Sequence, residues 1–166
     1  FAKELEENYQ LKENIKDMAN FAKEAKVNLR PHIKAHKLPA IANMQIEMGA
    51  KGITVSKLGE AEVMIDSGIT DILIAYQLIG NEKMEKLMGL AKRADITVAI
   101  DSLEGAQQLN QVCIEAGQRI KVVIEINSGL DRCGVLPGLA TLKLANKINK
   151  LTNITLKGIM THAGHV

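Results

Sequence analysis

Two kinds of segment alternate along the whole chain, and this alternation limits the possible folds more than any other feature. Short apolar runs rich in β-branched residues predict six strands, at residues 27–35, 52–56, 71–76, 96–101, 121–127 and 156–162. Amphipathic stretches predict helices at about residues 8–26, 38–49, 57–68, 80–93, 102–117 and 137–150. Strands that alternate with helices run parallel and are covered by those helices. The chain is therefore a doubly wound sheet or a (β/α) barrel.

Capping residues support the predicted helix boundaries. Ser56 and Ser102 stand just before helical runs, where a serine side chain can accept a hydrogen bond from a free backbone N–H group. Gly49, Gly68 and Gly117 stand where helical runs end, and glycine is the residue that most easily adopts the left-handed conformation found there. The periodicity and the end signals agree.

The distribution of polar residues favours a barrel over a doubly wound sheet. Neither the G-x-G-x-x-G motif nor the G-x-x-x-x-G-K-[ST] motif of nucleotide-binding sheets is present. Polar side chains instead follow nearly every strand: Lys34, His36, Ser56, Lys57, Tyr76, Gln77, Asp101, Asn127, Thr161 and His162. Active sites of (β/α)8 barrels are assembled from many strand ends in this way. We regard Gln77, Asp101 and Asn127 as structural residues.

The number of units is too small for a closed barrel. An eight-stranded barrel needs eight βα units, and only about six are recognisable in the 166 residues. We therefore expect residues 1–166 to be one partial barrel, from a longer protein. The unpaired strand edges predict self-association, as a homo-oligomer such as a dimer.

Composition excludes several classes of partner. The net charge of +2 is too small and too dispersed to indicate a nucleic acid or a membrane surface. No apolar run approaches the roughly 18 residues of a membrane span, and the first residues are charged throughout. Cys113 and Cys133 lack the spacing of a metal site or a disulfide framework. These features indicate a cytoplasmic protein.

The stretch LRPHIKAHK, residues 29–37, concentrates basic side chains in a segment that reads as a strand. With a period of two, one face carries Arg30, His32, Lys34 and His36 and the other is apolar. Neighbouring cations favour the neutral, nucleophilic form of a lysine amine, which can form a Schiff base with a carbonyl group. Lys34, at the centre of the basic face, is the predicted nucleophile.

Two other interpretations of this stretch remain. Basic residues near a strand end can simply be solvated. His32 and His36 also form an H-x-x-x-H pair, but on an extended strand they lie about 13 Å apart, at about 3.3 Å per residue. Such a distance prevents both from binding one metal ion.

Several motifs resemble a known family. LRPHIKAHK, KGITVSKLGEAEVM, DILIAYQLIG, NSGLDRCGVLPG and LKGIMTHAGHV are similar to segments of the D-threonine aldolase and D-serine dehydratase group, from about residue 8 to the end. These are pyridoxal-phosphate enzymes built on the N-terminal barrel of the alanine racemases. The resemblance implies a lyase that acts on small D-amino acids. Lys34 then matches the lysine that binds the cofactor as a Schiff base, with His32 as its neighbour, or as a hydrogen-bonded core histidine.

The resemblance also assigns residues near the other strand ends. Arg132 matches an arginine close to the cofactor, although a loop arginine paired with Asp131 is the alternative. His162 is expected to contact the cofactor ring. The aldolases and dehydratases usually carry tyrosine there and the racemases histidine, so an amino-acid racemase remains open. His165 is either a catalytic acid or base or a plain loop residue.

The family also has parts that are not recognised in this sequence. They are a phosphate-binding loop after the sixth strand and a β-rich C-terminal domain, which in the aldolases and dehydratases contributes a divalent metal site. No ligands for that metal are recognised here. A non-catalytic fragment that binds pyridoxal phosphate is therefore a further alternative.

Overall fold

The computed structural model describes residue 4 and residues 8–164, and its centre is a parallel sheet of five strands. All neighbouring strands run parallel. They lie side by side in chain order: β1 (Ile53–Val55), β2 (Asp71–Ile74), β3 (Asp95–Ile100), β4 (Ile120–Ile126) and β5 (Ile154–Thr161). This order is that of consecutive βα units that wind in one direction, as in a (β/α) barrel. The predicted α/β class is confirmed.

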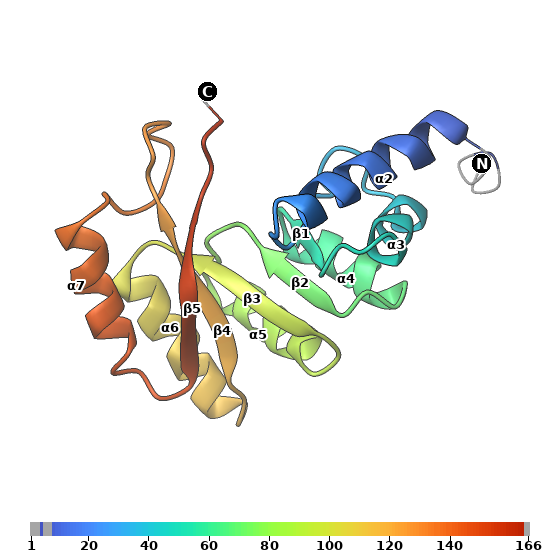
Figure 1. The fold of residues 1–166 in the computed structure, drawn as a ribbon. Helices are drawn as coiled ribbons and strands as arrows, with labels where there is room; N and C mark the ends of the chain where they lie inside the picture. Colours follow the sequence, from blue (N-terminus) through green and yellow to red (C-terminus); the bar gives the residue numbers. More distant parts are fainter. Residues whose placement is uncertain (1–3, 5–7, 165–166) are drawn as a thin grey trace.

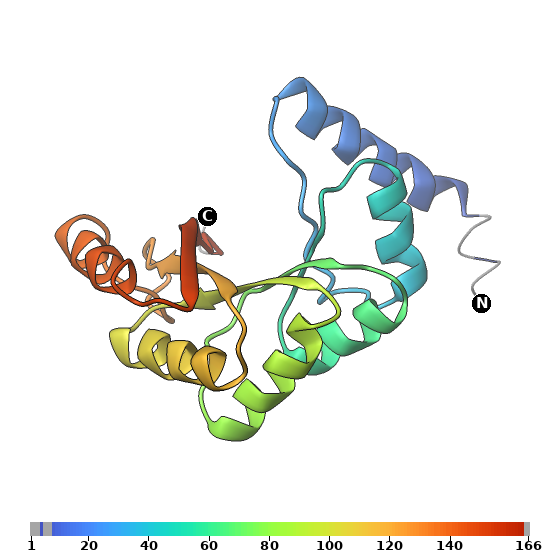
Figure 2. The ribbon, with the colours of Figure 1, turned by 90° about the horizontal axis from the view of Figure 1, so that it is seen from below.

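Helices cover one face of the sheet, as Figure 2 shows. The helices are α2 (Tyr9–Glu24), α3 (Pro39–Glu47), α4 (Leu58–Asp66), α5 (Asn81–Ala91), α6 (Leu103–Glu115) and α7 (Leu139–Ile148). Each helix from α4 to α7 connects two successive strands, whereas α2 lies at the N-terminal end of the molecule beside α3 (Figure 1). Among these described residues, no helix is both long and apolar enough to cross a bilayer.

The main core fills the space between the sheet and the helices. Ile72 and Ile74 of β2 are fully buried, whereas Leu73 between them lines a cavity on the opposite face. Successive side chains of a strand point to opposite faces, so the isoleucines pack under α4 and α5 and Leu73 faces the concave side. A smaller cluster, which contains Ile15 and Ile41, joins α2 to α3.

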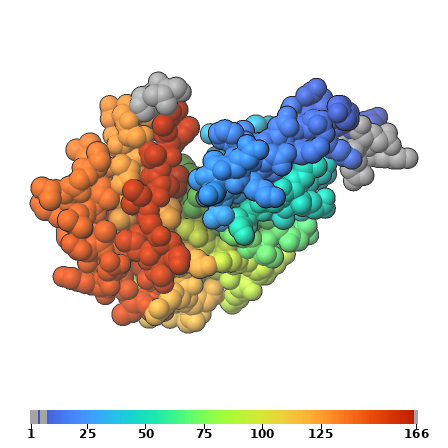
Figure 3. All heavy atoms as spheres, viewed as in Figure 1, coloured from blue at the N-terminus to red at the C-terminus, as the bar shows by residue number. Residues whose placement is uncertain are grey.

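The sheet is open at β5. Among the residues that the structure describes, only β4 pairs with this strand, and Ile159 near its end is 68% exposed. Figure 3 shows a recess between the C-terminal part of the chain and the N-terminal part. The open sheet agrees with the expectation of a partial barrel.

The first predicted strand is wrong. Residues 27–35 form no strand, and only one isolated bridge joins His32 to Thr54 of β1. Lys51 N–H donates to Leu29 O and Thr54 N–H donates to Pro31 O, so this segment runs beside β1. The proline has no N–H group to contribute to a ladder, and the chain then turns at residues 33–36. The segment starts in strand-like pairing and cannot continue it.

The predicted caps are confirmed with one exception. Ser102 accepts a hydrogen bond from Gly105 N–H at 3.2 Å, and Gly49, Gly68 and Gly117 follow their helices with positive φ. Ser56 is not the N-cap of α4. Lys57 holds that position, without a side-chain cap bond.

Candidate active site

Lys34 lies on a turn at the carboxyl end of the sheet, next to β1. The turn comprises residues 33–36, and its closing bond runs from Lys37 N–H to Ile33 O at 2.8 Å. Ile33 is fully buried, and its N–H group donates to Thr54 O at 2.9 Å. The turn is therefore anchored to β1 at its first residue, while the Lys34 side chain stays exposed.

His32 supports this turn through its ring. Nδ1 of His32 accepts a hydrogen bond from Lys34 N–H at 3.3 Å. Burial lowers the pKa of His32, and the nearby charge of Lys34 lowers it further, while Glu60 opposes both effects. The imidazole is thereby kept in its neutral form, the only form in which Nδ1 can accept this bond.

The loop of residues 127–135 carries Arg132 toward the same edge of the sheet. Asn127 Oδ1 accepts hydrogen bonds from Gly129 N–H at 3.0 Å and from Asp131 N–H at 3.2 Å. Asn127 Nδ2 donates to Asp131 Oδ1 at 2.7 Å. One asparagine at the end of β4 therefore shapes the first half of the loop, and Asp131 serves as its partner.

The second half of the loop folds back onto β4. Val135 N–H donates to Glu125 O, and Asn127 N–H donates to Val135 O, both at 2.9 Å. Gly134 has a φ of +98°, and a Cβ atom on it would lie 2.7 Å from Asn127 N. Its N–H group donates to Asp101 Oδ2 at 3.1 Å. A strand-end aspartate and a glycine thus fix the loop, in the structural roles expected for Asp101 and Asn127.

His162 follows β5 and is half-buried. A Cβ atom on Gly164 would lie 2.8 Å from His162 Nε2, so a side chain at residue 164 would require the His162 ring to move. Thr161 Oγ1, just before it, donates to Ile126 O at 3.1 Å and lies 2.6 Å from Ser128 Oγ. The end of β5 is thereby tied to the start of the Arg132 loop. His165 lies outside the described residues.

Two cavities meet at Lys34. One, of about 310 Å³, lies on the concave face of the sheet, and the other, of about 590 Å³, lies above the strand ends. Both are lined by His32, Lys34 and Arg132, whereas His162 lines only the first. Ligand sites of proteins have volumes of roughly 300–1,000 Å³. The structure therefore gathers four of the five predicted site residues around one candidate active site.

Glu125 is a site residue that the sequence analysis missed. Its side chain is 4% exposed and lines the smaller cavity together with Arg132. Gln77 Nε2 donates to Glu125 Oε2 at 2.5 Å, and Cys133 Sγ donates to Glu125 Oε1 at 3.1 Å. The signal in the sequence was a glutamate inside the apolar run KVVIEIN, because a buried strand tolerates a carboxylate only with such partners.

Two members of the predicted basic face have other positions. Arg30 Nη2 forms an ion pair with Asp71 Oδ1 at 2.9 Å, at the start of β2 and therefore at the opposite end of the sheet. His36 Nδ1 accepts a hydrogen bond from Leu38 N–H at 3.1 Å before α3. Burial lowers the pKa of His36, and Gln45 opposes this, although neither His36 Nε2 nor Gln45 Oε1 makes a hydrogen bond of good geometry.

The loss of the strand explains the separate position of His36. A period of two places side chains on one face only while the backbone stays extended. The turn at residues 33–36 interrupts that period, so the prediction of one continuous basic face is wrong for His36, whereas Arg30, His32 and Lys34 line the same cavity. His32 and Lys34 line both cavities, whereas Arg30 lines only the cavity on the concave face.

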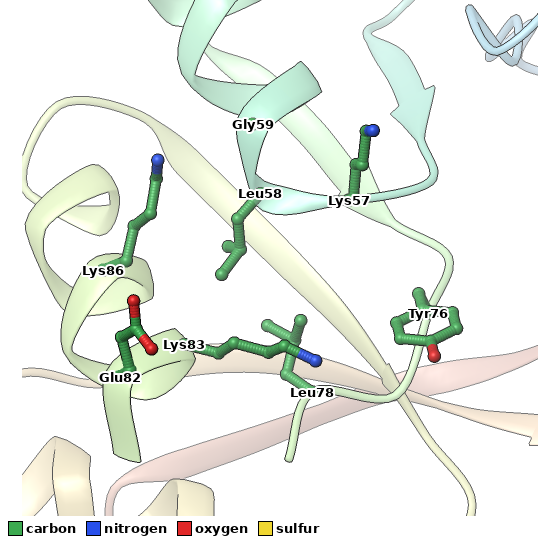
Figure 4. A pocket seen from close by; sticks show the side chains of 8 residues that line it. All are labelled: Lys57, Leu58, Gly59, Tyr76, Leu78, Glu82, Lys83 and Lys86. Carbon is green, nitrogen blue, oxygen red and sulfur yellow. The ribbon is translucent and has the colours of Figure 1, made fainter. Parts of the chain in front are cut away.

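A separate pocket of about 290 Å³ lies between α4 and α5 (Figure 4). Leu58 and Leu78 form its apolar part, and Lys83 and Lys86 extend from α5. Lys86 Nζ is paired with Glu62 Oε2 at 2.6 Å. Tyr76 lines this pocket and also the larger cavity at Lys34, so its ring stands between the two.

A search for metal ligands gives no candidate within the described part of the chain. There, no three histidine, cysteine, aspartate or glutamate side chains come together as a possible metal site.

Known proteins are similar to this chain in sequence and in fold. The chain is 37% identical over 153 residues to a D-threonine aldolase from Arthrobacter sp, and 36% identical over 139 residues to a D-threo-3-hydroxyaspartate dehydratase from Delftia sp. (strain HT23). These matches cover 92% and 83% of the chain but only 40% and 37% of the relatives.

A solved structure gives the same picture. The D-threonine aldolase from Filomicrobium marinum superposes with a TM-score of 0.87 at 40% identity, over 90% of this chain and 40% of the other. The model of the alanine racemase N-terminal domain matches residues 8–166. The chain therefore belongs to the alanine racemase N-terminal domain family.

Proposed function

We propose that the chain is the cofactor-binding part of a pyridoxal-phosphate-dependent lyase that acts on D-amino acids. The observation that carries the proposal is the position of Lys34, a residue that lines both cavities together with Arg132 and His32. Membership of the family and the 37% identity to a D-threonine aldolase support the cofactor and the reaction class.

The residues around the cavities fit the chemistry of this cofactor. A lysine amine is the group that binds an aldehyde covalently, and an arginine is the natural partner for an oxyanion on the same ring. When bound, pyridoxal phosphate supplies an electron sink for the electron pair left at the substrate Cα atom. The phosphate group and any divalent metal of the family would be held by parts outside this chain.

Each site residue has a proposed task. Lys34 Nζ would hold the cofactor, and the same amine would be placed to move a proton at the substrate Cα atom. Arg132 stabilises the negative charge of the ring oxygen, and His162 packs against the ring. His165 is proposed as an acid or base at the substrate, on the sequence resemblance alone. A homodimer and a cytoplasmic location are proposed on the sequence arguments given above.

Borohydride trapping tests the cofactor assignment. The chain is incubated with pyridoxal phosphate, reduced and digested, and the modified peptide is identified by mass spectrometry. Label at Lys34 that is lost in Lys34→Ala would support the proposal, with Lys51→Ala, an exposed lysine before β1, as the control. Label spread over several surface lysines would contradict it.

A second function is favoured by one observation. The family model describes an alanine racemase domain. His162 stands where, by the sequence resemblance, the alanine racemases carry histidine and the aldolases and dehydratases usually carry tyrosine. Incubation with D-threonine, D-serine and D-alanine separates the reactions. Aldehyde or keto acid indicates a lyase, and L-alanine a racemase. A chain that is labelled at Lys34 but turns over none of them would be a non-catalytic fragment.

A further inference from the structure

Glu60 is a buried carboxylate that joins the Lys34 turn to the start of α4. Its side chain is 7% exposed. Oε1 lies 3.1 Å from Lys37 Nζ, and Oε2 accepts a hydrogen bond from Ser56 N–H at 2.8 Å. Both oxygens are therefore used, one by each of two segments that border the site.

The charge state of Glu60 follows from these partners. Burial alone would raise the pKa of this carboxyl group, but the Ser56 N–H bond and the ammonium group of Lys37 outweigh burial and lower it. Glu60 is thus ionised at neutral pH. A buried carboxylate that loses its cationic partner keeps a negative charge that nothing neutralises. Loss of the interaction with Lys37 should therefore lower the stability of the fold around Glu60.

Lys37 closes the turn that carries Lys34. Its backbone has a φ of +54°, a left-handed conformation that lysine adopts at a cost, and its N–H group donates to Ile33 O at 2.8 Å. Ile33 holds the front of the turn through Thr54. The ion pair between Lys37 and Glu60 holds the last residue of the turn in place.

We infer that Glu60 is a positioning residue that keeps the Lys34 turn in its closed form through Lys37, so that the Lys34 amine faces the two cavities. The inference rests on the proposed function only where it makes Lys34 the cofactor lysine. Glu60 itself lines neither cavity. Its effect on the site is transmitted through Lys37 and the turn, and through its charge, which raises the pKa of the cavity-lining His32.

A simple capping role for α4 is the competing explanation. Glu60 stands in the first turn of that helix, and its bond to Ser56 N–H satisfies a free backbone donor there. Glu60→Gln separates the two roles, because the amide oxygen can still accept from Ser56 N–H while the charge that faces Lys37 is lost. Lys37→Met removes the ion pair and leaves the cap intact.

The control is Glu62→Gln. Glu62 lies on the same helix, and its carboxylate pairs with Lys86 at 2.6 Å, on an exposed surface away from the turn. Glu62→Gln is the same type of substitution as Glu60→Gln and also removes an ion pair with a lysine, but it makes no change near residues 33–37. Each variant is first checked by circular dichroism and thermal unfolding.

Hydrogen exchange without cofactor is the first measurement. We expect the amide of Lys37, which closes the turn, to exchange about tenfold faster or more in Glu60→Gln and in Lys37→Met, and at the original rate in Glu62→Gln. We expect the double variant to be no worse than the worse single variant, since both remove one interaction. Unchanged exchange in folded Glu60→Gln and Lys37→Met would overturn the inference.

Covalent attachment of pyridoxal phosphate at Lys34 is the second measurement. Its rate should fall about tenfold in both turn variants and stay unchanged in Glu62→Gln. If no protein attaches the cofactor at Lys34 but the exchange difference persists, the proposed function fails and the positioning of the turn stands. If Glu60→Gln does not fold, Lys37→Met, whose side chain is 55% exposed, decides the question alone.

Discussion

Two irregular segments bring cations to the candidate site, and they are held in different ways. The turn at residues 33–37 presents Lys34 and depends on side chains that titrate: the His32 ring and the Glu60–Lys37 ion pair. The loop at residues 127–135 presents Arg132 and depends mainly on backbone bonds to β4, on Asn127 and on the close packing of Gly134, with one further hydrogen bond from Gly134 N–H to the Asp101 carboxylate.

Each segment contains one non-glycine residue in the left-handed region, and the choice of residue differs. Asp131 and Lys37 both have a φ of +54°. Aspartate tolerates this conformation because its short side chain bonds locally, here with Asn127. Lysine has no such local bond and uses a distant carboxylate instead. The loop is therefore a rigid support, whereas the turn is sensitive to charge.

The largest effect is expected from Gly134→Ala in the rigid loop. The new Cβ atom would lie 2.7 Å from Asn127 N and 2.9 Å from Ile126 C, at a φ of +98°. We expect the free energy of unfolding to fall by about 3 kcal/mol, measured by urea denaturation. Gly117→Ala, with a φ of +63° and no atom within 4 Å, should cost only about 1 kcal/mol. If both variants lost the same free energy of unfolding, the close packing of Gly134 against β4 would contribute nothing to stability.

Asn127→Ala is expected to have the next largest effect. It removes two bonds accepted by Oδ1 and one donated by Nδ2, all within the loop. The expected loss is about 1–2 kcal/mol of unfolding free energy, with faster hydrogen exchange at Gly129 and Asp131. Asn20→Ala on the exposed surface of α2 should stay within about 0.5 kcal/mol of the original. Unchanged hydrogen exchange at Gly129 and Asp131 would mean that the backbone hydrogen bonds alone hold the loop in place.

The turn should respond to pH where the loop does not. The pKa values of His32 and His36 are lowered in the folded state, burial being the first cause of each, so the folded state favours the neutral rings. Their contribution to stability is fully present above about pH 6.5 and is lost as the pH falls through the lowered values. Hydrogen exchange at Lys34 and Leu38, corrected for intrinsic rates, should rise in this range.

The double variant His32→Asn/His36→Asn sharpens this test. An asparagine Oδ1 can replace the accepting Nδ1 atom but does not titrate. The pH dependence of exchange in the turn should be reduced in this variant, while Gly129 and Asp131 should show none in either protein. Equal pH dependence in both segments would contradict the distinction between them.

The smallest effect concerns a thiol in the loop. Burial raises the pKa of Cys133, and its hydrogen bond to Glu125 raises it further, so alkylation near neutral pH should be slow. Gly134→Ala should speed up this reaction several-fold by loosening the loop. Burial raises the pKa of Cys113 to about 11, so this thiol should stay unreactive in both proteins. A simple iodoacetamide time course with mass detection separates the two sites.

Local patterns were sufficient to predict most of the fold. The runs at residues 52–56, 71–76, 96–101, 121–127 and 156–162 became β1 to β5, because each is short and apolar and the first four are each followed by an amphipathic helix. Ser102 and three glycines marked helix ends, because capping depends on neighbouring residues alone. Arg132 and His162 were predicted from the resemblance of their motifs to a known family and Lys34 from its basic stretch as well, and all three line one cavity.

Contacts between distant segments decided the rest. The stretch at residues 29–37 has the periodicity of a strand, but Pro31 and the ion pair of Lys37 with the buried Glu60, 23 positions further along the chain, turn it into the support of Lys34. Neither Glu60 nor Glu125 was assigned a role from the sequence. The sequence by itself determined the βα units and the chemistry at their ends. Only the tertiary structure decided which buried charges are partners, because the free energy of a buried charge depends on neighbours that local pattern cannot identify.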